Sequence, residues 1–154
     1  MDKIELRKVL CKEEGYEVVE IIINNRKLTE ILKEVEKPYA EEEGHPDLAG
    51  RYLGIIPKYV FYPSELLFGN PDPVLVYSEG KVTVLDCPCG CYGCWPIEVK
   101  ISVLEDTVIW SAFEQPHRSL EKWTYEGMRP FIFSREQYES EWKKYEVEAE
   151  KNSI

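Results

Sequence analysis

The sequence is short of basic residues, since 19 lysines and arginines stand against 29 aspartates and glutamates and the formal charge is −10. A protein that binds the phosphate backbone of a nucleic acid needs a basic face to release its counterions, and an anionic membrane surface also attracts basic segments. We therefore expect no nucleic-acid partner and no membrane partner. Acidic charge is also common in proteins that are simply soluble, so it does not identify a protein or small-molecule partner.

Long apolar runs are also missing. No stretch approaches the roughly 20 apolar residues that a membrane-spanning helix needs. The first residues, MDKIEL, lack the basic and then apolar character of a secretory signal peptide. We therefore expect a protein of the cytoplasm, where clustered cysteines bind metals or carry out redox chemistry more often than they form structural disulfides.

The familiar motifs of catalysis and nucleotide binding are absent, among them G-x-S-x-G, H-E-x-x-H, G-x-G-x-x-G and the phosphate-binding loop. The chain has only two histidines, His45 and His117, and the sequence pairs neither with a nucleophile. These absences give no reason to name a particular reaction. A metal- or thiol-dependent enzyme that uses His45, His117 and the cysteines stays open as an alternative.

The patterns that are present predict one α+β domain over residues 1–154, with a mainly antiparallel sheet of about six strands and two main helices. An apolar stripe predicts a helix that Asn24–Asn25 can cap and that Pro38 ends or kinks near Lys37. A capping box at Ser134 predicts the second helix. Strands are expected at residues 3–11, 16–23, 74–77, 81–86, 97–103 and 107–113.

The stretch from His45 to Pro73 has no regular period, because prolines and glycines interrupt it closely. It is nevertheless too apolar for a disordered linker. We expect an ordered segment that wraps over the core, with a short helical turn around residues 64–68. Long ordered loops are uncommon and often functional, so this segment is a candidate surface for a partner or ligand.

The most unusual stretch is DCPCGCYGCWP at residues 86–96, which holds four of the five cysteines. Zinc favours four thiolate or imidazole ligands in a tetrahedron, and Gly90 and Gly93 leave the backbone free to bring several donors to one ion. Four ligands from so short a loop require strain, whereas three from the loop and one from elsewhere do not. The sequence therefore predicts a structural zinc site.

His117 is the candidate for the fourth ligand, because the turn at residues 105–106 folds two strands back and brings His117 near Cys94. Cys91 is the alternative, which would give four thiolates. Other interpretations of the cysteines remain: reduced thiols in a glycine-rich turn, a thiol redox pair, or an iron–sulfur cluster. Cys91 and Cys94 form a C-x-x-C pair, but strands rather than a helix start surround it. Cys11 is expected to serve packing.

Three strings in the chain resemble a family of small, uncharacterised bacterial proteins: EGHPDLAG at residues 43–50, C-x-C-G-x-x-G-C-W-P at 87–96, and W-x-x-F-E-Q-P-H-R at 110–118. The resemblance extends over most of the chain from Leu28 onward. It implies a bacterial protein but no activity. Cysteines that match Cys87, Cys89 and Cys94 occur in the family pattern, whereas Cys91 is an addition, so the resemblance favours Cys87, Cys89, Cys94 and His117 as the metal ligands.

Together these observations predict a non-enzymatic binding or interaction domain, stabilised by a cysteine-rich loop that binds zinc.

Overall fold

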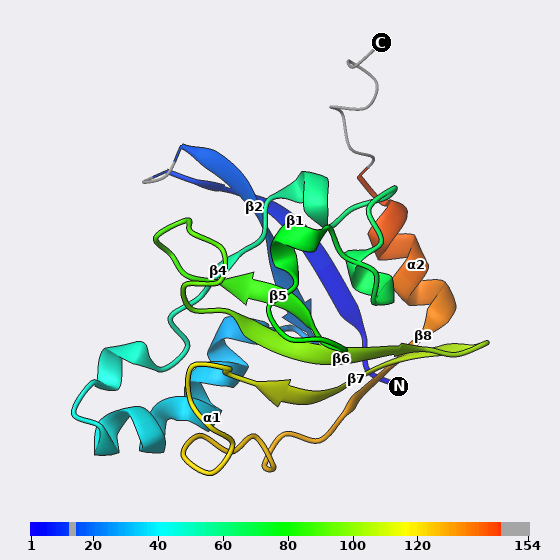
Figure 1. The fold of residues 1–154 in the computed structure, drawn as a ribbon. Helices are drawn as coiled ribbons and strands as arrows, with labels where there is room; N and C mark the ends of the chain where they lie inside the picture. Colours follow the sequence, from blue (N-terminus) through cyan, green and yellow to red (C-terminus); the bar gives the residue numbers. More distant parts are fainter. Residues whose placement is uncertain (13–14, 146–154) are drawn as a thin grey trace.

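The computed structural model describes residues 1–12 and 15–145, and this part of the chain forms eight strands and two α-helices (Figure 1). The first sheet has the order β1-β2-β3 and the second the order β4-β5-β6-β7-β8, with every neighbouring pair antiparallel. The elements are β1 (Ile4–Cys11), β2 (Tyr16–Ile23), β3 (Arg26–Lys27), α1 (Leu28–Glu42), β4 (Leu53–Gly54), β5 (Val82–Asp86), β6 (Ile97–Val103), β7 (Thr107–Glu114), β8 (Phe131–Ser134) and α2 (Arg135–Lys143).

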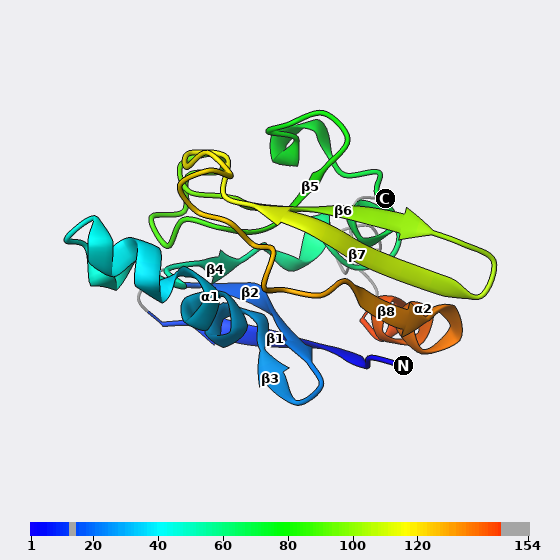
Figure 2. The ribbon, with the colours of Figure 1, turned by 90° about the horizontal axis from the view of Figure 1, so that it is seen from below.

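The predicted α+β class is confirmed, with two helices and antiparallel pairing. The strands divide into two sheets, which Figure 2 shows as separate layers, where the sequence predicted a single sheet of about six strands. Six of the strands are four residues or longer, and β3 and β4 have only two residues each. The buried residues of both sheets and both helices, such as Ile21, Leu32, Val99 and Tyr138, belong to one hydrophobic core.

β4 joins the two layers. Its two residues pair with the end of β5, and the carbonyl of Ile55 just beyond it accepts a hydrogen bond from the Val19 N–H of β2 at 2.8 Å. Gly54 makes this approach feasible, because a Cβ atom at that position would lie 2.1 Å from the Val19 carbonyl oxygen. Only glycine fits so close to another backbone.

α1 begins at Leu28, later than the sequence predicted. Asn24 and Asn25 have positive φ angles of 53° and 67° and form the turn between β2 and β3, so neither caps the helix. Of the end or kink predicted near Lys37, the end is wrong, since α1 continues through Pro38 to Glu42. Proline removes a single hydrogen bond inside a helix. The buried residues Leu32, Glu36 and Ala40 on the apolar side of α1 hold it against the core across this position.

Half of the predicted capping box of α2 is present, since the Ser134 hydroxyl accepts a hydrogen bond from the Gln137 N–H at 3.4 Å as an N-cap. The Gln137 side chain points to β1, where its Oε1 accepts from the Ile4 N–H and its Nε2 donates to the Ile4 carbonyl. Glu141, one turn later, accepts from the Leu6 N–H. Side chains of α2 thus bond the outer edge of the first sheet.

The long irregular segment is ordered, as expected. It contains 3-10 turns at Pro46–Leu48, Pro57–Tyr59 and Leu66–Phe68, and the last of these lies where a helical turn was predicted. The strand predicted at residues 74–77 is wrong, because Pro73–Leu75 is a further 3-10 turn. Pro73 fixes φ at its first position and Asp72 caps it by accepting from the Val74 N–H.

Two register shifts interrupt the second sheet near the end that carries the cysteines. One lies between Thr83 and Leu85 of β5, and the other between Glu98 and Lys100 of β6. On β7, opposite the second shift, Ala112 has a φ of 56°. Such bulges bend a strand and redirect the side chains that follow, so they set the direction in which the chain leaves the sheet.

No helix in residues 1–12 and 15–145 combines the length and apolar character that crossing a membrane requires.

Candidate metal centre

Asp86 shapes the cysteine loop. This last residue of β5 is 2 % exposed, and its carboxylate accepts three backbone hydrogen bonds from the loop that follows. The donors are the N–H groups of Cys87 at 2.7 Å, Gly93 at 2.8 Å and Trp95 at 3.1 Å. A single buried carboxylate therefore fixes both ends of the loop between β5 and β6 before any ion binds.

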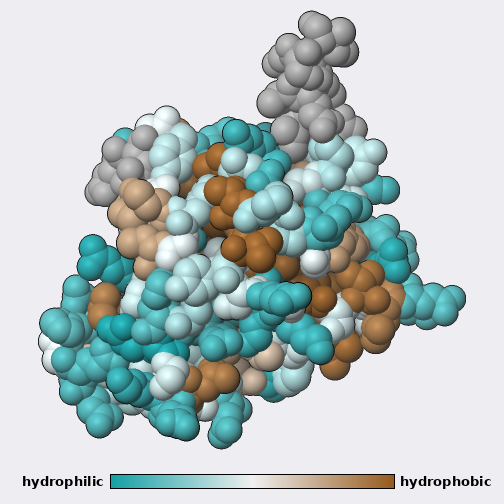
Figure 3. Space-filling model, in the orientation of Figure 1, coloured by the Kyte–Doolittle hydropathy of each residue, from teal (hydrophilic) through white to brown (hydrophobic). Residues whose placement is uncertain are grey.

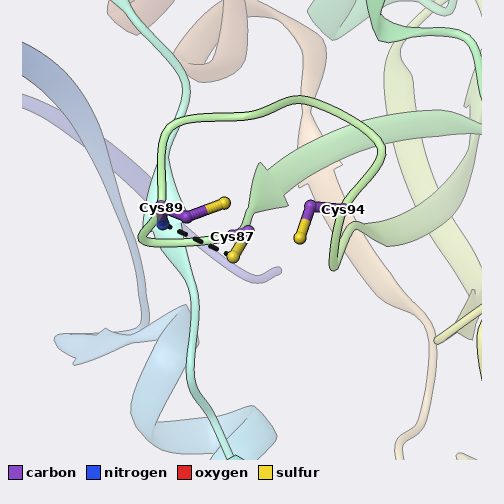
Figure 4. A group of neighbouring side chains, drawn as sticks. All are labelled: Cys87, Cys89 and Cys94. Carbon is purple, nitrogen blue, oxygen red and sulfur yellow. Dashed lines mark hydrogen bonds between the residues drawn. The ribbon is translucent and has the colours of Figure 1, made fainter.

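The loop brings three of its four cysteines together. The sulfur atoms of Cys87, Cys89 and Cys94 all lie within 4.8 Å of one another, and Figure 4 shows the three side chains side by side on the loop. The Cys89 N–H donates to the Cys87 sulfur at 3.4 Å, a contact that orients the first two donors. Cys87 is half-buried, whereas Cys89 and Cys94 are exposed. Three thiols this close could bind a metal ion.

Two glycines make the loop geometry accessible. Gly90 and Gly93 have φ angles of 85° and 86°, in the left-handed region that side chains disfavour. Gly90 is the last residue of a first turn, in which its N–H donates to the Cys87 carbonyl at 3.1 Å. Gly93 lies inside a second turn, closed by the Cys94 N–H on the Cys91 carbonyl at 3.3 Å. The two turns reverse the chain twice and so return Cys94 to the first two cysteines.

The pKa of the Cys87 thiol and that of the Cys89 thiol depend on their surroundings and on the neighbouring thiols. Burial raises the pKa of Cys87 to about 12, and a hydrogen bond from Cys87 lowers the pKa of Cys89. Three thiolates packed together would repel one another, so only part of the cluster ionises without a cation. A divalent ion replaces the protons of the thiols and removes the repulsion between thiolates. For this reason thiolate sites release protons when they bind a metal.

Cys91 and His117, the two candidates for a fourth ligand, both lie outside the group of three. The Cys91 thiol is exposed and hydrogen-bonds with the Cys89 thiol, which raises the pKa of Cys91. The His117 Nε2 donates to the Gly93 carbonyl at 2.9 Å, so this nitrogen carries a proton. Among the residues that the structure describes, no fourth donor lies within 4.8 Å of the three sulfurs.

Two aromatic rings contact the His117 imidazole. The Trp95 ring stacks on it with centroids 6.0 Å apart and an interplanar angle of 9°. The Tyr77 ring contacts it edge-on at 5.0 Å. Coordination of a metal through Nε2 would require the imidazole to leave Gly93 and this stack.

His45, the other histidine of the sequence-based alternative, precedes the turn at Pro46–Leu48 and lies outside the group of three sulfurs. Cys11 ends β1, also outside that group. Cys11 therefore provides a matched control for experiments on the cysteine loop.

A buried hydrogen-bond network continues inward from His117. Its N–H donates to Gln115 Oε1 at 2.9 Å, and Gln115 Nε2 donates to the Pro96 carbonyl at 2.9 Å and to the Tyr52 hydroxyl at 3.3 Å. Gln115 is fully buried, so its amide is dedicated to these contacts. The network connects the end of the cysteine loop at Pro96 with the core.

The network ends at Glu36, a buried carboxylate on α1. The hydroxyls of Tyr52 and Tyr125 donate to its Oε2, and the Gly50 N–H donates to its Oε1 at 2.9 Å. Burial raises the pKa of Glu36 above its usual range despite these hydrogen bonds. Burial also raises the pKa of Tyr52 and that of Tyr125, so both phenols stay protonated as donors. Glu36 thus joins α1 to two segments that are distant in sequence.

A salt bridge at the surface borders the site. Arg118 donates to both oxygens of Glu43 at 3.0 and 3.1 Å, and its guanidinium lies over the Trp95 ring at 5.0 Å. Trp123 Nε1 also donates to Glu43. A cleft of 730 Å³ lies beside this group, lined by Tyr39, Glu42, Glu43, His117, Arg118, Ser119, Glu121 and Lys122, and by none of the cysteines.

The sequence pattern predicted the three clustered cysteines as site residues but not Asp86, Gln115 and Glu36. A signal existed for Asp86, because an acidic residue that ends an apolar strand and directly precedes a cysteine is a natural acceptor for loop N–H groups. No comparable signal marks Gln115 or Glu36, whose partners come from distant parts of the chain.

Comparison with known proteins gives no assignment, since no protein-family model, no curated protein and no solved structure matches this chain.

Proposed function

We propose that this protein is a non-enzymatic binding domain whose cysteine loop, residues 87–94, holds one zinc ion as a structural cross-link. The observation that carries the proposal is the approach of three sulfurs to within 4.8 Å on a loop that Asp86 already orders. The family resemblance and the composition favour a protein of the bacterial cytoplasm. Thiols stay reduced there and remain available to a metal.

Zinc fits this donor set better than a hard cation does. Thiolates are soft ligands, which zinc accepts and which magnesium and calcium avoid. A structural zinc site has four protein ligands. We favour Cys91 as the fourth ligand, because it lies on the same short loop as the three cysteines, whereas His117 would first leave the Gly93 carbonyl.

The position of the loop in the fold supports a structural role. It connects β5 to β6, two strands in the interior of the second sheet. An ion bound there would fix the connection at the point where a register shift already disturbs the pairing. Binding free energy at such a site adds directly to the stability of the folded state.

For the binding role, the exposed apolar side chains mark the surface beside the loop. The large apolar side chains between His45 and Pro73 are buried or partly buried, and the exposed one in that stretch is Tyr62. Val74, Val76 and Tyr77 follow it and are about half exposed, and the Tyr77 ring contacts His117. Residues 74–77 are therefore the proposed contact for a protein or small-molecule partner. Figure 3 shows brown hydrophobic residues gathered among hydrophilic ones on one face of the molecule.

Metal analysis of protein purified without added zinc tests the metal proposal. We expect about one zinc ion per chain, and a melting temperature that falls by several degrees when a chelator removes it. Restoration of zinc should recover the original transition. Protein that is free of metal as purified, and whose melting temperature does not respond to added zinc, would rule the site out.

Single substitutions identify the fourth ligand. Cys91→Ser should lower zinc affinity by about tenfold or more, as loss of one ligand does, while His117→Ala should leave it unchanged. Cys11→Ser is the matched control and should behave like the wild type. The opposite pattern, with His117→Ala weakening zinc and Cys91→Ser silent, would move the fourth position to His117.

One observation favours a second candidate, a metal-dependent enzyme. The three sulfurs have no fourth donor among the described residues, and a catalytic zinc site has three protein ligands and an open position. If Cys91→Ser and His117→Ala both retain full zinc affinity, the site has an open position and the enzyme becomes the better proposal.

A further inference from the structure

The Cys89 sulfur occupies a distinctive place in the loop. Its sulfur lies within 4.8 Å of the sulfurs of Cys87 and Cys94, and its N–H donates to the Cys87 sulfur at 3.4 Å. Its side chain is also exposed, so a small oxidant in solvent reaches it directly. By contrast, Cys87 is half-buried.

From this arrangement we propose that the cysteine loop is an oxidation site, in which a hydroperoxide converts Cys89 into one half of a disulfide and releases the bound metal. The release of metal rests on the proposed zinc site. Formation of the disulfide depends only on the arrangement of the thiols.

The chemistry proceeds in two steps. The Cys89 sulfur attacks one oxygen of the hydroperoxide; the O–O bond breaks, an S–O bond forms, and an alcohol or water leaves with the proton. A neighbouring thiol then attacks the Cys89 sulfur, an S–S bond forms, and the S–O bond breaks to release water. The two sulfurs supply the two electrons that reduce the hydroperoxide.

Cys94 is the expected second half of the disulfide. Its sulfur lies within 4.8 Å of the Cys89 sulfur, and both residues are exposed. The small movement that forms the disulfide therefore requires no change in the burial of either side chain. Cys87 and Cys91 are each separated from Cys89 by one residue, and a ring that small is strained relative to ordinary disulfide geometry. Gly90 and Gly93 lie between Cys89 and Cys94 and give the backbone freedom to adjust.

Loss of the metal follows from the change in ligands. Sulfurs joined in a disulfide are no longer thiolates, and the thiolate is the form that binds metal. A Cys89–Cys94 bond removes two of the three clustered donors at once. The remaining donors are too few for a structural zinc site.

The experiment treats zinc-loaded full-length protein with one equivalent of hydrogen peroxide and follows zinc with a chromogenic chelator. We expect one zinc ion released per disulfide formed, and rebinding after reduction by a dithiol. A parallel sample without metal is oxidised, alkylated and digested, and mass spectrometry should find Cys89 linked to Cys94. Cys11→Ser should give the same linkage and the same release.

Cys89→Ser should abolish the disulfide, measured in metal-free protein so that weakened zinc binding does not interfere. Its circular dichroism spectrum shows whether the variant is folded, and Cys94→Ser provides a second variant that should also lose the bond. A disulfide that excludes Cys89, or oxidation only to sulfinic acid, would overturn the inference. If zinc never binds but the Cys89–Cys94 bond forms, the zinc proposal fails while the oxidation site stands.

Discussion

At the level of single residues, Asp86 orders the backbone of the cysteine loop. Its carboxylate accepts from three N–H groups of the loop, and the side chain is buried. Asp86→Ala leaves those donors without an acceptor, so we expect a loss of about 2–4 kcal/mol in the free energy of unfolding and weaker metal binding. Urea denaturation and a zinc titration measure the two effects.

Asp72→Ala is the control for this substitution. The Asp72 carboxylate also accepts a backbone hydrogen bond, from the Val74 N–H at 3.0 Å, but Asp72 is exposed whereas Asp86 is buried. Its removal should cost about 0.5–1 kcal/mol, as loss of a helix cap does. Equal losses in the two variants would contradict the role given to Asp86.

Ala112 shows a second residue-scale effect, because its φ of 56° is unfavourable for any residue with a Cβ atom. Ala112→Val adds a branched side chain there and should destabilise the fold by about 1–2 kcal/mol, whereas Ala112→Gly should be neutral or slightly stabilising. Ser111→Val, one residue earlier in β7, is the control and should change stability by less than about 0.5 kcal/mol. Thermal unfolding of the three variants checks this order, and an Ala112→Val variant as stable as the wild type would contradict it.

At the scale of elements, Glu36 fixes α1 to the segment around Gly50 and to Tyr125. Burial raises its pKa above the ordinary 4.5. At pH values between 4.5 and the raised pKa, Glu36 is therefore protonated in the folded protein and ionised in the unfolded chain. The stability that this group contributes is complete below pH 4.5 and falls as pH rises toward the raised pKa. Glutamine does not titrate.

Glu36→Gln should therefore become more stable relative to the wild type as pH rises from about 4 to about 7. Urea denaturation at several pH values in this interval gives the comparison. Glu30→Gln, at an exposed position on the same helix, should show no such trend. A difference between Glu36→Gln and the wild type that moves in the opposite direction with pH would contradict the assignment.

Local signals predicted the elements well where the signal and the contact lie close in sequence. The N-cap at Ser134 and the hairpin of β1 and β2 are of this kind. The end of α1 was not predictable, because packing of Ala40 and its neighbours beyond Pro38 outweighs the break that proline favours. The 3-10 turn at Pro73–Leu75 replaced an expected strand for a local reason, the proline itself, which the apolar pattern of the following residues concealed.

At the scale of the whole molecule, the sequence predicted the α+β class but not the division into two sheets. Alternation of apolar residues reports that a strand has a buried face, and it carries no information about which sheet the strand joins. The division depends on contacts such as the Val19 N–H with the Ile55 carbonyl, which no local pattern encodes. The candidate site follows the same rule: the cysteines were visible in the sequence, and the buried network from Gln115 to Glu36 was not.

A cobalt titration of reduced, metal-free protein is the sharpest test of whether Cys87, Cys89 and Cys94 bind one metal ion. Cobalt(II) replaces zinc in thiolate sites and gives intense near-ultraviolet bands when sulfur coordinates it. We predict saturation at about one equivalent with thiolate bands, displacement by zinc, and the same result for Cys11→Ser, with the bands much weaker in Cys87→Ser and Cys94→Ser. A titration without saturation, or a spectrum that these two substitutions leave unchanged, would contradict the account.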